Sequence, residues 1–276
     1  MAVQDAHTKK KRILFICDAH LGSGINEQEK EEVLVEFIKN LSPESVTTLY
    51  VLGDLFDFWF EYESVILSRY FRILTTLAEA VQRGIDIHLV VGNHDFWAGD
   101  FLTKTIGLKV HRDPIEIELG GRRVYLCHGD GVNPYDRGYR VLKVLLRNSA
   151  VIWLARWVHP DMLMRLAHRF SRYSREASSV AGKLREDEGI LRFAQKKLGE
   201  GIDIVIAGHS HRPHEERYSI DGAVRYYYNP GDMQERFSYL EYSDGKFHLK
   251  YIGREEEPPQ TRTGGRFTHG GAHTSS

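Results

Sequence analysis

The segment IDIVIAGHSHRP, residues 202–213, joins an apolar run to two histidines that are separated by one serine. Its β-branched first half predicts a buried strand that ends at Gly208. Because alternate side chains of extended backbone point the same way, His209 and His211 would face a common site. Such a pair can bind one metal ion or two neighbouring ions, or it can be an ordinary polar loop. The remaining sequence has to decide between these interpretations.

Four other apolar runs have the same form: RILFIC (12–17), VTTLYVL (46–52), IDIHLVV (85–91) and RVYLC (123–127). They are apolar almost throughout, which is typical of strands covered on both faces. Helical periodicity separates the first three runs, at 31–41 and 68–84. Turn pairs predict three β-hairpins, at Gly120-Gly121, Asp221-Gly222 and Asp244-Gly245. We therefore predict a layered α/β domain with a mixed sheet or a pair of sheets.

Each of the five runs ends at residues that are able to bind a metal ion. The motifs are CDAH (17–20), GDLFD (53–57), GNHD (92–95), HGD (128–130) and GHSH (208–211). In layered α/β folds, ligands gather at the carboxyl ends of the strands. The candidate metal ligands are Asp18, His20, Asp54, Asn93, His128, His209 and His211.

The types of these side chains indicate the kind of ion. Asp, His and Asn without Cys favour a divalent ion such as manganese, iron or zinc. Seven ligands suit two ions if Asp54 bridges them, and two ions roughly 3.5–4 Å apart can clamp the oxygens of an in-line displacement at phosphorus. His94 could donate a proton to the leaving oxygen, and Asp95 could orient His94. Each residue alone could be a polar strand-end contact, whereas seven together are hard to attribute to chance.

Charge is nearly balanced, with 37 basic and 38 acidic residues, which gives no general argument for nucleic-acid binding. Residues 133–185 differ, because they hold eleven Lys and Arg against three acidic residues. Within 139–158, fourteen of twenty residues are apolar. This predicts helices that pack on the core, on each other, on lipid or on a partner. The alternative is an ordinary helical subdomain with a solvated basic face.

The chain lacks a stretch with the length of a signal peptide or membrane span, so we expect a cytoplasmic protein. A peripheral contact with the inner face of a membrane stays open. We expect one domain over 1–254, with 133–185 as a helical insertion, and a disordered tail over 255–276. Trp153 and Trp157 are expected to pack between helices. Cys17 and Cys127 are expected to be buried, reduced thiols.

In their order along the chain, the five motifs resemble those of the calcineurin-like metallophosphoesterases, over roughly residues 12–231. The resemblance implies a four-layer α/β/β/α sandwich and a catalytic role for His94. It implies a first ion held by Asp18, His20, Asp54 and His211. It implies a second ion held by Asp54, Asn93, His128 and His209.

A narrower resemblance is carried by GDLFDFWFEY (53–62), HGDGVNPYDRGYR (128–140) and SRYSREAS (171–178). These segments look like the UDP-2,3-diacylglucosamine pyrophosphohydrolases of lipid A biosynthesis, in which the insertion forms a lid for acyl chains. The resemblance implies hydrolysis to UMP and 2,3-diacylglucosamine 1-phosphate with two Mn²⁺ ions, Fe or Zn being the alternatives. One branch of that family has arginine at the position of His94, and another has histidine. The implied substrate contacts are Asn93, His94, Asp136, Ser174 and Arg175.

Three other functions stay open on the sequence alone. The first is a soluble phosphodiesterase or phosphatase for a nucleotide or another small phosphate ester. The second is a binding module that has kept the sandwich and lost catalysis, although no ligand is missing here. Nucleic-acid processing ranks below both, because the basic residues of the insertion alternate with aliphatic ones rather than with stacking aromatics.

Overall fold

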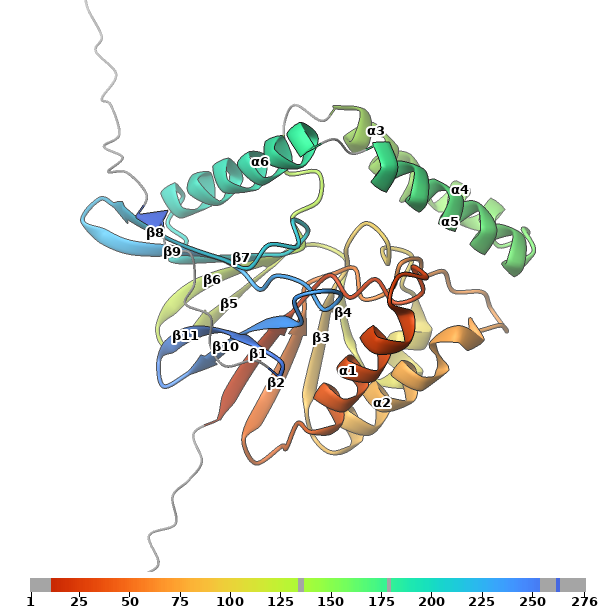
Figure 1. The fold of residues 1–276 in the computed structure, drawn as a ribbon, viewed down its shortest axis with the longest axis horizontal. Helices are drawn as coiled ribbons and strands as arrows, with labels where there is room; N and C mark the ends of the chain where they lie inside the picture. The colour runs from red at the N-terminus through yellow and green to blue at the C-terminus, as the bar shows by residue number, and fades with distance from the viewer. Residues whose placement is uncertain (1–10, 134–136, 178–179, 254–261, 264–276) are drawn as a thin grey trace, which may run out of the picture.

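The computed structural model describes residues 11–133, 137–177, 180–253 and 262–263 (Figure 1). Its first sheet combines parallel pairing of the first four strands with an antiparallel hairpin from the C-terminal part. The order is β11 (Lys246–Tyr251), β10 (Ser238–Ser243), β1 (Arg12–Ile16), β2 (Val46–Val51), β3 (Asp86–Val90) and β4 (Lys109–His111).

The second sheet contains the strand that leads into the histidine pair. In it, β7 is parallel to both neighbours, and hairpins flank this central group. The order is β12 (Arg262–Thr263), β8 (His214–Ile220), β9 (Ala223–Asn229), β7 (Ile204–Ala207), β6 (Arg122–Cys127) and β5 (Ile115–Leu119). The three predicted hairpins are therefore confirmed as β5–β6, β8–β9 and β10–β11.

Helices cover the outer face of each sheet (Figure 1). On the first sheet lie α1 (Glu27–Lys39) and α2 (Phe71–Gln82), which follows a short 3-10 helix, η1 (Ser68–Tyr70). A π-helical turn, η2 (Phe101–Ile106), leads into β4, and α6 (Val180–Gly199) covers the second sheet. The order of layers is helices, sheet, sheet, helix, as in the predicted four-layer α/β/β/α sandwich.

Both faces of each central strand are buried, which explains the apolar runs in the sequence. In β1, Leu14 and Ile16 pack toward α1 and α2, whereas Phe15 between them packs between the two sheets. In β7, Ile204 and Ile206 face the other sheet and Val205 packs under α6. A strand that is buried on two faces needs apolar side chains at successive positions.

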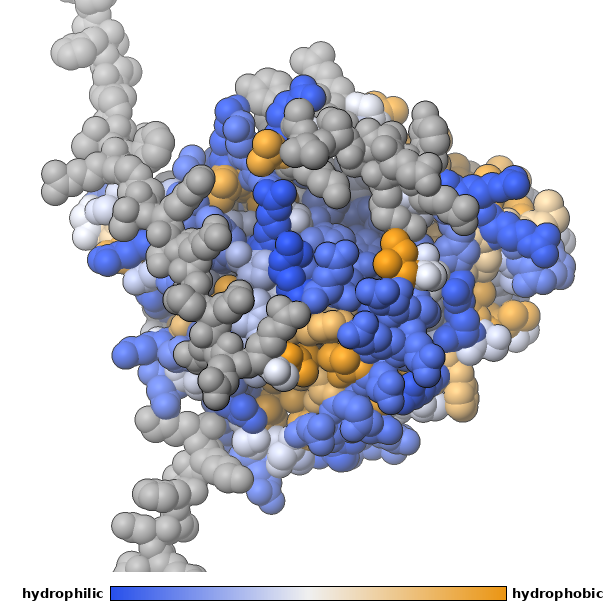
Figure 2. Space-filling model, in the orientation of Figure 1, coloured by the Kyte–Doolittle hydropathy of each residue, from blue (hydrophilic) through white to orange (hydrophobic). Residues whose placement is uncertain are grey.

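The helical insertion contains α3 (Arg137–Leu146), α4 (Ser149–Ala155) and α5 (Pro160–Ala177), which lie beyond the strand ends in Figure 1. Apolar residues lie beside hydrophilic ones on the protruding helices at the right of Figure 2. Trp153 and Trp157 contact each other, with ring centroids 6.0 Å apart. Their exposed fractions are 56% and 75%, so the prediction that they are packed between helices is wrong. In the described part of the chain, no helix is long and apolar enough to cross a bilayer.

Some predicted features fall outside the described residues. Asp136 is one of them. The predicted disordered tail, 255–276, also lies outside the described residues, apart from Arg262 and Thr263. These two residues form the short strand β12, which pairs with β8, so this part of the tail is not disordered as predicted. Ser174 and Arg175 belong to α5, but their side chains are outside the described part of the structure.

Candidate metal centre

The five predicted metal-binding motifs follow β1, β2, β3, β6 and β7, and their side chains meet at the carboxyl ends of these strands. At five of the seven candidate ligands the backbone has a positive φ: Asp18, His20, Asp54, His209 and His211. Residues other than glycine rarely adopt this conformation, which costs on the order of 1 kcal/mol each. Such a concentration of strained backbone is typical of a functional site that the surrounding fold holds in place.

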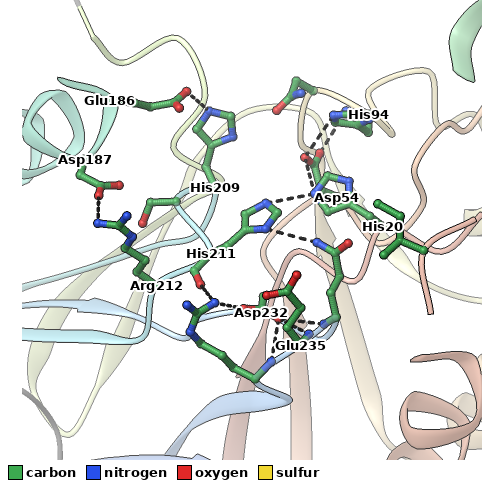
Figure 3. A pocket seen from close by; sticks show the side chains of 15 residues that line it. His20, Asp54, His94, Glu186, Asp187, His209, His211, Arg212, Asp232 and Glu235 are labelled. Carbon is green, nitrogen blue, oxygen red and sulfur yellow. Dashed lines mark hydrogen bonds and ion pairs between the residues drawn. The ribbon is translucent and has the colours of Figure 1, made fainter. Parts of the chain in front are cut away.

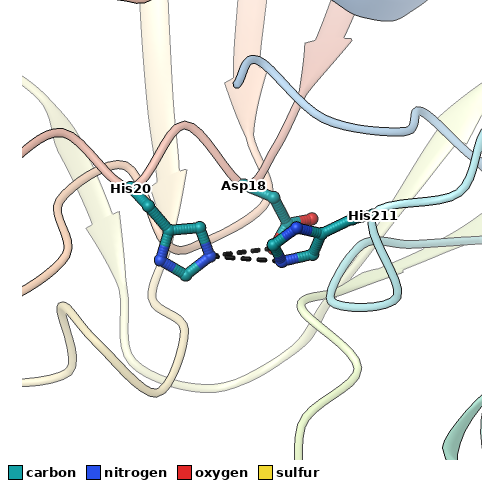
Figure 4. A group of neighbouring side chains, drawn as sticks. All are labelled: Asp18, His20 and His211. Carbon is teal, nitrogen blue, oxygen red and sulfur yellow. Dashed lines mark hydrogen bonds and ion pairs between the residues drawn. The ribbon is translucent and has the colours of Figure 1, made fainter. Parts of the chain in front are cut away.

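The first cluster consists of Asp18, His20 and His211 (Figure 4). His20 Nε2 lies 3.2 Å from His211 Nε2, and Asp18 Oδ1 lies 3.6 Å from His211 Nε2 and 3.9 Å from His20 Nε2. Asp18 Oδ1 is buried and has no hydrogen-bond partner among the described residues. A buried carboxylate oxygen without a donor is costly. A divalent cation between these three side chains would satisfy that oxygen.

The second cluster consists of Asp54, His128 and His209, with Asn93 beside them. His128 Nε2 lies 3.1 Å from Asn93 Oδ1, 3.1 Å from His209 Nδ1 and 3.3 Å from Asp54 Oδ2. The same Asp54 oxygen lies 3.5 Å from His20 Nε2 of the first cluster. Asp54 therefore stands between the two clusters, as expected of a bridging ligand.

His128 and His209 each donate a hydrogen bond from the ring nitrogen that lies away from the second cluster. The lone pair of the other ring nitrogen then points into the cluster. His128 Nδ1 donates to the carbonyl oxygen of Leu52 at 2.8 Å, which leaves Nε2 as an acceptor. His209 Nε2 donates to the Glu186 carboxylate at 2.7 Å, which leaves Nδ1 as an acceptor. A divalent cation between these two nitrogens, which lie 3.1 Å apart, would be bound by both lone pairs. Glu186 was not predicted from the sequence, in which it is one acid among several on a polar helix.

The charge of the second cluster favours a cation. Burial alone would lower the pKa of His128, but the Asp54 carboxylate raises it well above its ordinary value. Burial would likewise raise the pKa of Asp54, but His128 and His94 hold it well below its usual range. Asp54 is thus ionised, and the cluster stabilises positive charge beside its carboxylate. A metal ion supplies that positive charge, so the residues present fit a divalent ion.

Glycines allow these segments to approach one another. At Gly53, φ is +84°, and a Cβ atom would overlap the His128 ring and the backbone of Gly92. At Gly92, a Cβ atom would overlap the Asp54 carboxylate. Side chains larger than hydrogen at these positions would push the second cluster apart.

His94 lies beside both clusters, with Nε2 3.9 Å from Asp54 Oδ2. Its Nδ1 donates to the backbone carbonyl of Asp57 at 2.6 Å, so Nε2 is the nitrogen that faces the site. The sequence predicted that Asp95 orients His94. Instead, the buried Asp95 carboxylate accepts hydrogen bonds from Gly92 N at 2.6 Å and Leu55 N at 2.9 Å. Asp95 therefore fixes the two loops, and the Asp57 carbonyl orients His94.

A cavity of about 430 Å³ opens over the centre, and Figure 3 shows its polar walls. Arg212 pairs with Asp187 at 3.0 Å on one side. On another side, Asp232 accepts hydrogen bonds from three successive backbone amides and from Arg236 Nη1. Of the predicted substrate contacts, Asn93 and His94 line this cavity.

Comparison with known proteins agrees with this geometry. The family model described as calcineurin-like phosphoesterase matches residues 11–213. A UDP-2,3-diacylglucosamine hydrolase from Porphyromonas gingivalis is 34% identical over 220 residues, which cover 73% of this chain and 84% of that protein. A protein of the same name from Aeromonas salmonicida is 31% identical, and the match covers 86% of this chain and 92% of that protein.

Among solved structures, a dimetal phosphatase from Danio rerio matches with a TM-score of 0.45 and 14% identity, covering 88% of this chain and 96% of that one. The family model spans well over half of the chain. The chain belongs to the calcineurin-like phosphoesterase family of hydrolases.

Proposed function

We propose that this chain hydrolyses the pyrophosphate bond of UDP-2,3-diacylglucosamine to UMP and 2,3-diacylglucosamine 1-phosphate. The relatives that carry this substrate in their names support the proposal, since they align over most of the chain. The observation that carries it is the arrangement of seven oxygen and nitrogen donors beside a helical insertion with exposed apolar side chains. Such a site combines a centre for phosphoryl chemistry with a surface for acyl chains.

Two divalent ions would be held by the two clusters, with Asp54 between them. The ligand set favours Mn²⁺, Fe or Zn, and we propose Mn²⁺. When bound, the ions supply an activated water and neutralise charge on the phosphoryl oxygens. In the reaction the water oxygen would form a bond to the phosphorus nearer the uridine, and the bridging P–O bond would break with its electron pair leaving on the sugar phosphate. The protons of the water would pass to solvent.

The residues of the chain position the reacting groups. Asp18 and Asp54, both fully buried, hold the centre rigidly because their backbone lies at strand ends. His94 Nε2 is the atom available to hydrogen-bond a phosphoryl oxygen of the substrate, since Nδ1 is engaged by Asp57. Asn93, Asp136, Ser174 and Arg175 remain proposed substrate contacts.

The insertion is proposed to accommodate acyl chains and to contact the inner face of a membrane peripherally. Exposed apolar side chains on α4 and α5 include Trp153, Leu154, Met162, Leu166 and Phe170. Arg156, Arg165 and Arg169 lie among them and are exposed. This combination suits the boundary between lipid headgroups and acyl chains. A cytoplasmic location follows from that proposal.

The experiment compares two substrates with the Mn²⁺-loaded protein: UDP-2,3-diacylglucosamine, with UMP release as readout, and bis(p-nitrophenyl) phosphate. Replacing residues 149–158 with a Gly/Ser linker removes α4 and leaves α5 in the chain. We expect glycolipid turnover to fall at least about tenfold while the small diester is still hydrolysed. No UMP release by the unaltered protein, together with efficient diester hydrolysis, would contradict the proposal. That result would favour the soluble phosphodiesterase.

A further inference from the structure

A second cavity, of about 380 Å³, lies next to the metal centre and shares no lining residue with the first. His128 lines this second cavity, whereas its hydrogen-bond partners Asn93 and His209 line the first. The two cavities therefore meet at one buried imidazole. Nothing in the proposed hydrolysis uses the second cavity.

Its walls carry more positive than negative charge. Arg140 and Lys143 lie on α3, and Arg147 directly follows its last residue, with its backbone amide still donating to Lys143 O. The three are spaced three and four residues apart, so they lie on the same side of the helix. Arg112 joins them from the segment between β4 and β5. Of the two acids in the walls, Asp130 is paired with Lys143 at 2.5 Å. The three arginines have no ion-pair partner among the described residues, and only Asp113 remains to offset them.

Arg147 is the residue that most clearly lacks a ligand. Its Nε is buried and has no hydrogen-bond partner within the described part of the chain. Its Nη1 donates, at 3.5 Å, to the backbone oxygen of Arg112, which brings two arginines to the same side of the cavity. The Arg147 guanidinium also lies over the Phe96 ring, 5.9 Å from its centroid, but neither contact gives Nε an acceptor. A buried donor without an acceptor is unfavourable, and an anion would relieve it. Guanidinium groups match the oxygens of phosphate in geometry.

An apolar strip runs beside the cationic face of the same helix. Val141, Val144 and Leu145 are exposed by 70%, 73% and 56%. At 100° per residue, their face of α3 is adjacent to that of Arg140, Lys143 and Arg147. A ligand along α3 could therefore place an anionic group in the cavity and a hydrocarbon chain on the strip.

We propose that the second cavity binds the phosphate group of an anionic membrane lipid, with the apolar strip of α3 against its acyl chains. This inference rests on the proposed membrane contact and gives it a specific site. It does not depend on which substrate is hydrolysed, and lipid binding and hydrolysis are measured separately.

The test uses co-sedimentation of the Mn²⁺-loaded protein with vesicles of phosphatidylcholine, with or without phosphatidylglycerol. The pocket variant is Arg140→Gln/Arg147→Gln. The matched control is Arg156→Gln/Arg165→Gln, which removes two exposed arginines of the insertion outside the cavity. Each lost positive charge should weaken the non-specific attraction to an anionic vesicle by about fivefold, and both variants lose two charges. We expect the pocket variant to bind phosphatidylglycerol vesicles about tenfold more weakly than the control does. Thermal melting checks that both variants are folded.

Equal weakening in the two variants would overturn the proposal in favour of unspecific surface charge. A third arm measures calorimetric binding of glycerol 3-phosphate, a soluble phosphate ester. If the pocket variant loses this binding but keeps full vesicle binding, the site takes a soluble phosphate and the lipid assignment is wrong. Loss of vesicle binding with unchanged diester hydrolysis supports the inference and leaves the hydrolytic function untouched.

Discussion

His168 Nδ1, on α5 of the insertion, lies 3.3 Å from Asp57 Oδ2, beneath the metal centre. Arg69 Nη1 lies 2.6 Å from His168 Nε2, and because a guanidinium only donates, Nε2 accepts and Nδ1 carries the proton toward Asp57. Ser171 donates to the other Asp57 oxygen at 3.2 Å, and that oxygen lies 3.7 Å from His20 Nδ1. Asp57 thus joins the insertion to His20, a proposed metal ligand.

His168→Ala removes the hydrogen bond from α5 to Asp57, so we expect the insertion to be held less tightly in its position over the metal centre. The value of kcat/KM for the glycolipid should fall about tenfold, mainly through KM, since a hydrogen bond to a charged group contributes roughly 1.5–3 kcal/mol. Diester hydrolysis and metal content should change little. His168→Asn, whose amide can replace the Nδ1 donor, should recover most of the loss. An equal loss on both substrates would show that His168 acts on the chemistry rather than on the insertion.

Gly53→Ala should damage the metal centre far more than a comparable change at Gly84. Both glycines have positive φ, +84° and +98°, but a Cβ at Gly84 would meet nothing within 4 Å. Gly84→Ala should therefore cost only the conformational strain, about 1 kcal/mol. Gly53→Ala adds the overlap with His128 and should lower the free energy of unfolding by about 3 kcal/mol or more. Urea denaturation measures both, and equal costs would contradict the close packing at Gly53.

Asp232→Asn should destabilise the protein in a way that depends on pH. Burial would raise the pKa of Asp232, but hydrogen bonds from the backbone amides of residues 234–236 and from Arg236 lower it. A lowered folded-state pKa stabilises the protein above the unfolded value of about 3.9, and this contribution disappears as pH falls through the folded value. The variant should lose about 2 kcal/mol at pH 7, and the difference should shrink below about pH 4. A difference that is independent of pH would rule out the ionised carboxylate as its source.

The layers, and the meeting of the seven candidate ligands at one site, could be predicted because they leave strong patterns in the sequence. Burial on two faces requires apolar runs, as in β1 and β7, and each ligand follows directly after such a run. The residues that orient the ligands leave no such pattern. Glu186, which holds His209, and His168, which reaches Asp57, are single polar residues on amphipathic helices. Only the tertiary packing of α5 and α6 reveals their partners.

The prediction for Asp95 failed for a related reason. Its position next to His94 suggested a contact between the two side chains, but successive residues at a strand end point in different directions. The Asp95 carboxylate turns inward to the amides of Leu55 and Gly92, while His94 turns outward to the cavity. The exposure of Trp153 on α4 and of Trp157 just after it likewise depends on where this helix lies, which periodicity does not determine.

Metal content tests the central claim most directly. Plasma mass spectrometry of the protein after loading with Mn²⁺ and gel filtration should give two ions per chain. Asp18→Asn removes the carboxylate of the first cluster and keeps an oxygen that can accept from His209 N, so it should reduce the content to about one. Anomalous difference maps should place one peak between Asp18, His20 and His211 and the other between His128, His209 and Asn93, with Asp54 next to both. A content well below one ion per chain, or peaks away from these side chains, would contradict the account.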